Sequence, residues 1–200
     1  MRTSPPALAP YLRSHTQAQI LALLVLHPQR SATIAEITRA TGAPGAVVHK
    51  EVSRLVDAGV LVDTRVGRAR LVQANPDYRL LAPLTQIIAA TYGPVPVLSA
   101  LVADVPGIDE AYLFGSWAAR HEGQPGDQPG DIDVLVIGTP DRASLNDIAR
   151  TAEQTLATPV SITKVTPAAW ANPDTDPFLR TVRSRPLVRL DLSTPVQVAS

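Results

Sequence analysis

The sequence predicts an α+β protein of two domains: N-terminal helices with a β-hairpin, then a small α/β sheet with flanking helices. Apolar residues recur at helical spacing over residues 16–58, and from residue 107 apolar strands alternate with amphipathic helices. Charge divides the same way, because nine basic and four acidic residues lie before position 76, against nine basic and fourteen acidic after it. The basic first part favours a polyanionic partner. We expect domains at 1–75 and 105–200, joined by a helical connector at 76–104.

Three helices are expected in the first domain. The first, Thr16 to His27, is mostly apolar and stops at Pro28. The second follows Thr33, which forms a capping-box pattern with Glu36 and precedes a helix stop at Gly42.

The third helix runs from Pro44 to a stop at Gly59 and has two different sides. A buried stripe is expected at Val48, Val52, Leu55 and Val56. The opposite side carries Gly45, Ala46, His49, Lys50, Ser53 and Arg54. Small residues followed by polar and basic ones suit close approach to a DNA groove.

A basic hairpin is expected after this helix. The stretch VLVDTRVGRARLVQANP places a turn near Val66-Gly67, with Arg65, Arg68 and Arg70 around its tip. Residues 16–75 thus resemble the winged helix-turn-helix of ArsR and MarR transcription regulators. The resemblance implies a double-stranded DNA partner, with the third helix in the major groove and the hairpin on backbone phosphate. The DNA contacts it implies are His49, Lys50, Ser53, Arg54, Arg65, Arg68 and Arg70. The alternative is a small helical bundle with an ordinary charged surface.

The connector contains two apolar segments. Leu80, Leu81, Leu84, Ile87 and Ile88 have helical spacing, and Pro83 predicts a kink or a restart there. A second helix is expected after Gly93-Pro94. In winged-helix regulators such helices often form the dimer contact, which implies a homodimer. They could equally cover the sheet of the second domain.

The second domain alternates strands and helices. Strands are expected at 107–115, 131–138 (buried on both faces), 159–165 and 186–192, and helices at 116–120, 142–156 and 176–185.

Two short motifs in this domain point to nucleotide chemistry. A Gly115-Ser116 turn opens a helix and exposes N–H groups that suit phosphate oxygens. Asp131 and Asp133 share one face of a strand and can hold Mg²⁺ together. Phe114-Gly115-Ser116 followed by Asp131-Ile132-Asp133-Val134 resembles the nucleotidyltransferases of the polymerase-beta superfamily. The resemblance implies a nucleoside triphosphate at Gly115 and Ser116, with Asp131 and Asp133 as metal ligands and catalytic residues.

The third carboxylate of that superfamily has no counterpart here. The next core strand offers Ser161, Thr163 and Lys164, while Asp109 and Glu110 lie on an earlier strand. Losing a general base typically costs about 100- to 10,000-fold in rate. We therefore expect a weak or absent transferase that still binds magnesium and nucleotide. The alternative for Asp131 and Asp133 is a pair of surface acids at a strand entrance.

The combined patterns favour a bacterial DNA-binding transcriptional regulator with a nucleotidyltransferase-like domain. Two alternatives remain: an active magnesium-dependent nucleotidyltransferase of the toxin–antitoxin type, modifying a protein, RNA or small molecule, and a scaffold that binds a protein partner. The chain has no cysteine, and the apolar run Ile20 to Leu26 is too short to span a bilayer. With no signal-peptide pattern, a cytoplasmic protein without a membrane partner is expected.

Overall fold

The computed structural model describes residues 12–67, 69–103, 105–127 and 129–193. The chain separates into two compact units, residues 1–93 and 94–200, so the division falls inside the expected connector. Each unit is described by itself.

The first unit is built around helix α1, His15–Val25, which packs against α2, Ile34–Thr41, and α3, Gly45–Asp57. The predicted capping box is present, because Thr33 Oγ1 accepts from the Glu36 N–H while the Glu36 carboxylate accepts from the Thr33 N–H. Gly42 ends α2 in the left-handed conformation that favours glycine. The largest fully buried side chains of these helices are Ile20, Leu24 and Ile37.

A three-stranded antiparallel sheet completes this unit, in the order β1-β3-β2. The expected hairpin is formed by β2, Leu61–Val66, and β3, Ala69–Ala74. The sequence did not predict β1, Ala32–Thr33, because two residues are too few to produce an alternating pattern. Three helices followed by this hairpin form a winged helix-turn-helix. Arg68 lies outside the described residues.

The connector forms two helices that belong to different units. Helix α4, Leu81–Tyr92, packs on α1, and α5, Pro94–Ala103, belongs to the second unit. A restart of the helix was expected at Pro83, and the continuous helix begins two residues earlier, at Leu81. The proline therefore lies in the first turn, where no intrahelical N–H bond is lost.

Length and composition alone would allow the 23 residues Leu81–Ala103 to cross a membrane. A bend at Gly93 interrupts this stretch. Val97, Leu98 and Val102 of α5 are buried in the core of the second unit. Part of the hydrophobicity of this stretch is therefore explained by packing in the core of the second unit.

The second unit contains a four-stranded sheet in the order β6-β5-β4-β7. Strand β5, Ile132–Gly138, pairs antiparallel with β4, Ile108–Phe114, and parallel with β6, Val160–Val165, while β7, Val188–Arg189, pairs with β4. Helix α6, Gly115–His121, joins β4 to β5, and α7, Arg142–Leu156, joins β5 to β6. Helix α9, Pro177–Arg183, was expected, whereas α8, Pro167–Ala171, and the 3₁₀ turn η1, Pro173–Thr175, were not.

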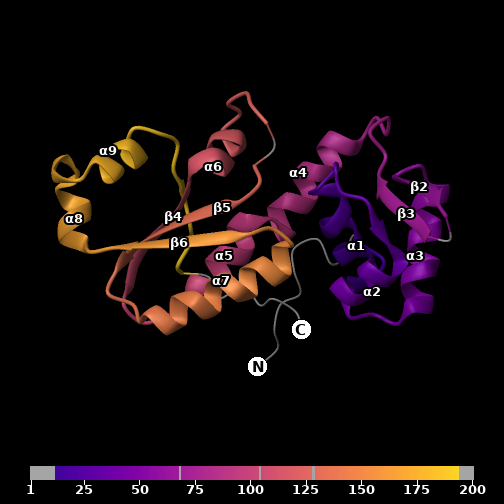
Figure 1. The fold of residues 1–200 in the computed structure, drawn as a ribbon, viewed down its shortest axis with the longest axis horizontal. Helices are drawn as coiled ribbons and strands as arrows, with labels where there is room; N and C mark the ends of the chain where they lie inside the picture. Colours follow the sequence, from indigo (N-terminus) through magenta and orange to yellow (C-terminus); the bar gives the residue numbers. More distant parts are fainter. Residues whose placement is uncertain (1–11, 68, 104, 128, 194–200) are drawn as a thin grey trace. The chain divides into compact units, whose positions relative to one another are not determined.

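Different helices cover the two faces of this sheet (Figure 1). Successive strand residues point to opposite faces, so the apolar residues of β5 divide between both. One face packs against α5 and α7 and includes Leu113, Val134 and Val136. The other includes Leu135 and Ile137, with Tyr112, Phe114 and Trp170 around them. By this alternation Asp133 lies on the second face.

Replacing the N-cap of α2 tests the capping box. Thr33→Ala removes the hydroxyl that accepts from the Glu36 N–H, and we expect the free energy of unfolding of the first unit to fall by about 1 kcal/mol. Urea denaturation measures this change. Ser31→Ala, two residues before the cap and exposed, is the control and should change stability by less than about 0.5 kcal/mol. Equal losses in both variants would contradict the capping role.

Candidate functional site

Helix α3 buries one side and exposes the side predicted to face DNA. Val48, Val52 and Leu55 are buried, as expected, and Val56 is half-buried. We define the α3 surface as the exposed residues Gly45, Ala46, Val47, His49 and Lys50 with the half-buried Ser53 and Arg54. The structure thus brings four of the predicted DNA contacts together on one helix.

Arg54 is not a free cation on this surface. Its Nη1 lies 2.9 Å from Oε1 of Glu51, one turn earlier in the same helix. The Glu51 side chain retains only 10% of its exposure, against 34% for Arg54. Sequence reasoning missed Glu51, although its helical position lies between the buried stripe and the polar side. An acid there needs a cation beside it, because burying an unpaired carboxylate is costly.

Arg70 connects the hairpin to α3. Its Nε lies 2.6 Å from Oδ2 of Asp63, and its Nη1 donates to Ser53 Oγ at 3.3 Å. Arg65 is the register partner of Arg70, so both side chains lie on one face of the hairpin. Arg65 is exposed and has no ion pair with the residues that the structure describes. Among its described residues, the hairpin therefore has one open cation, Arg65, and one that is internally paired, Arg70.

The second candidate site lies where β4 turns into α6. Gly115 has φ +73°, and a Cβ atom on it would overlap Oδ2 of Asp133. Ser116 and Asp131 are exposed, while Asp133 is half-buried. Phe114 pairs with Asp133 across the sheet. The structure thus brings Gly115, the next residue after Phe114, into direct contact with the Asp133 carboxylate.

The residue beside Asp133 on the next strand is Ser161, and Thr163 follows it on the same face. Within the described ranges, no group of three or more His, Cys, Asp or Glu residues could hold a metal ion. Burial raises the pKa of Asp133, and the negative charge of Asp131 raises it further. The carboxylates of Asp131 and Asp133 thus have the hydroxyl residues Ser161 and Thr163 on the neighbouring strand, and no third acid joins them among the described residues.

Comparison with known proteins gives only partial matches. No protein-family model matches the chain, and no curated protein matches it. A mutant of Lactococcus lactis ZitR is 22% identical over 39% of this chain and 51% of its own, with a TM-score of 0.33. The adhesin competence repressor AdcR of Streptococcus pyogenes is 24% identical over 38% of this chain and 55% of its own, with a TM-score of 0.33.

A third similar structure is BpsR of Bordetella bronchiseptica, whose DNA binding is regulated by 6-hydroxynicotinic acid. It is 24% identical over 44% of this chain and 67% of its own, with a TM-score of 0.32. The chain spans about half the length of the ZitR and AdcR chains that it matches. The helices and strand order of this chain themselves define its winged helix-turn-helix.

The contact between Gly115 and Asp133 can be tested through stability. Gly115→Ala places a side chain in the left-handed region, which costs about 1–2 kcal/mol, and also pushes against the Asp133 carboxylate. Gly123→Ala is the matched control, because Gly123 has φ +79° with no atom near its added Cβ. We expect Gly115→Ala to lower the free energy of unfolding more than the control does. Asp133→Ala should remove the excess, and an excess that persists in the double variant would contradict the contact.

Because the pKa of Asp133 is raised, removing its charge should increase the free energy of unfolding by an amount that depends on pH. The folded protein binds this proton more tightly than the unfolded chain does, so the stabilising effect of protonation is lost as the pH rises through the folded pKa. Asp133→Asn should therefore raise the free energy of unfolding at pH 7, with a smaller gain near pH 4. Urea titrations at both pH values measure this. The exposed Asp109→Asn is the control, and a gain for Asp133→Asn that grows toward low pH would be the opposite of the expected result.

Proposed function

We propose that this chain is a bacterial, cytoplasmic, DNA-binding transcriptional regulator that uses the α3 surface to contact double-stranded DNA. The observation that carries the proposal is the exposed side of α3, where His49 and Lys50 follow the small residues Gly45 and Ala46. Small side chains allow a helix to approach a groove closely, and the cations that follow can reach phosphate or base edges.

The hairpin supports the same proposal. Arg65 and Arg70 share one face of the hairpin, and Arg70 is tied to Ser53 of α3. A cation on the hairpin and cations on α3 would contact neighbouring parts of one duplex. A homodimer fits this proposal, because two such units would match two half-sites of an operator. Leu80 and Ile87 on the α4 segment are exposed apolar residues available for association, and light scattering tests the dimer.

DNA binding is tested by fluorescence anisotropy with the duplex upstream of the protein's own gene. Affinity should fall steeply with salt, because phosphate contacts release counterions. Lys50→Ala should weaken binding by roughly 3- to 10-fold and reduce the salt slope by about one. Arg142→Ala, an exposed cation on α7 of the other unit, is the matched control and should leave binding unchanged. If no duplex binds at low salt, the proposed function is wrong.

For the second unit we propose binding of a magnesium nucleotide without efficient transfer. The observation that favours it is the contact of Asp133 with Gly115, which brings a carboxylate against the turn that also carries Ser116. Mg²⁺ is commonly held by one or two protein carboxylates together with phosphates of the substrate, and two mutually repelling carboxylates fit such a cation. Ser161 stands beside Asp133 where a third acid would be needed, so no general base is assigned.

Calorimetric titration with ATP in the presence of Mg²⁺ tests this second proposal. Binding should be lost in Asp131→Asn and Asp133→Asn and retained in Asp109→Asn, an acid on the neighbouring strand. Incubation with labelled nucleoside triphosphates should give no labelled product. Product that disappears in Asp131→Asn would instead favour the active nucleotidyltransferase. Absence of nucleotide binding in the unaltered protein would leave the protein-partner scaffold as the better explanation of this unit.

A further inference from the structure

Helix α3 contains an acid that DNA binding alone does not explain. The whole Glu51 residue, backbone included, is 7% exposed, which makes it a buried charged residue on the helix proposed to contact DNA. Its Oε1 accepts from Arg54 Nη1 at 2.9 Å. Its Oε2 is also buried and has no hydrogen-bond partner among the described residues.

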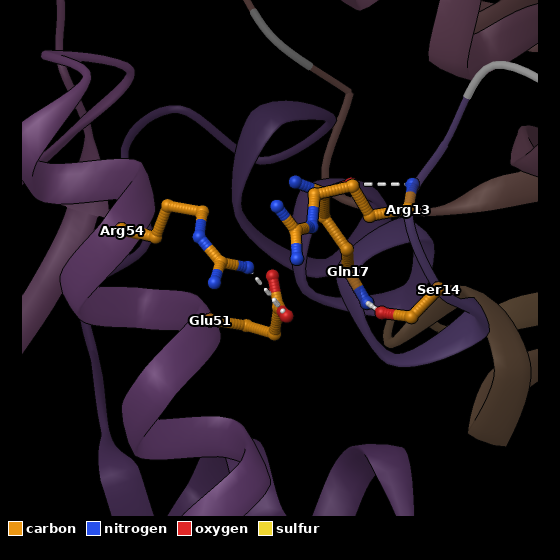
Figure 2. Close-up of polar contacts among 5 residues, drawn as sticks. All are labelled: Arg13, Ser14, Gln17, Glu51 and Arg54. Carbon is orange, nitrogen blue, oxygen red and sulfur yellow. Dashed lines mark hydrogen bonds and ion pairs between the residues drawn. The ribbon is translucent and has the colours of Figure 1, made fainter.

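A second guanidinium group faces this carboxylate. Figure 2 shows Glu51 between Arg54 and Arg13, whose side chains point toward it from opposite sides. Arg13 lies two residues before the first residue of α1, and its backbone N–H donates to Gln17 Oε1 at 3.0 Å. Ser14 next to it caps the helix by accepting from the Gln17 N–H at 3.1 Å. The backbone of Arg13 is therefore held next to the helix cap, and its side chain points toward the Glu51 carboxylate.

One buried carboxylate thus has two candidate cations, of which only Arg54 is bound. If Arg54 moved to a DNA phosphate, Glu51 would keep a buried charge without compensation, which is strongly unfavourable. A phosphate must therefore compete with Glu51 for Arg54. Arg13 is the cation placed to neutralise Glu51 when Arg54 leaves.

We propose that Glu51 is a positioning residue that holds Arg54 back from the DNA backbone, and that Arg13 replaces Arg54 on Glu51 when DNA binds. This inference rests on the proposed DNA binding. Glu51 and Arg13 then have opposite effects on DNA binding: Glu51 opposes the contact of Arg54 with phosphate, and Arg13 promotes it.

The first experiment measures DNA affinity and its salt dependence for Glu51→Gln, which keeps the shape of the side chain and removes its charge. Arg54 is then free to contact phosphate, and we expect binding roughly 3- to 10-fold tighter, with a salt slope steeper by about one. Asp57→Asn removes an exposed acid from the same helix without releasing a cation, so it is the matched control for general electrostatics. In an Arg54→Ala background, Glu51→Gln should give no more than the Asp57→Asn effect.

The second experiment is a double-mutant cycle with Arg13→Ala. Without Arg13, Arg54 stays with Glu51, so DNA binding should weaken about 2- to 5-fold. In the Glu51→Gln background Arg13 has no charge to neutralise, and Arg13→Ala should have no effect. Equal weakening in both backgrounds would show that Arg13 contacts DNA directly and would overturn the proposal.

The outcomes separate this inference from the function on which it rests. Absence of binding by the unaltered protein at low salt overturns both. Binding that Glu51→Gln weakens, with a thermal melt unchanged from the unaltered protein, overturns the role of Glu51 alone. If Glu51→Gln lowers the melting temperature, Glu51→Met, which also removes the charge but packs the buried position with an apolar side chain, must give the same tighter binding for the proposal to stand.

Discussion

Burial of one side of α3 is the constraint on which the proposed DNA contact depends. Val48, Val52 and Leu55 are fully or almost fully removed from water, and each contributes about 1.5–3 kcal/mol to keeping the helix in that orientation. Rotation of α3 would expose these three apolar side chains to water. His49 and Lys50 are therefore kept facing outward by core residues on the opposite side of the helix. The hairpin adds a second restraint, because Arg70 of β3 binds Ser53 on the same helix.

The acidic residues of the two candidate sites differ in their partners. In the first unit Glu51 is paired with Arg54, and Asp63 with Arg70. In the second, the part of the chain that the structure describes supplies no ion pair to Asp131 or Asp133, and their charges oppose each other. Internally paired acids are explained by the protein alone. The half-buried carboxylate of Asp133 beside the like charge of Asp131 is destabilising unless a cation from solution binds both. A magnesium nucleotide is therefore the better proposal for this site.

Local signals made much of the fold predictable. The capping box at Thr33, the stop at Gly42 and the helix 142–156 follow from side-chain chemistry within a few residues, and each is present. Strand β1 and helix α8 were not predicted, because two and five residues are too few for a periodic pattern. Strand β1 also depends on its pairing with β3, far along the chain. Pro83 indicated the start of α4 only to within two residues, because a proline is tolerated throughout the first turn of a helix.

The candidate sites were predictable as sets of residues but not as charge networks. The helical spacing of α3 groups Lys50 and Arg54 without any knowledge of packing. It does not show that Glu51 is buried or that Arg13, just before α1, points toward it, since both depend on how α1 and α3 pack. That packing changes the meaning of Arg54: a cation that looked free to bind phosphate must first leave a carboxylate. In the proposed DNA complex, the contribution of Arg54 to affinity would then be a difference between two ion pairs, which is smaller than either and more easily altered by one neighbouring charge.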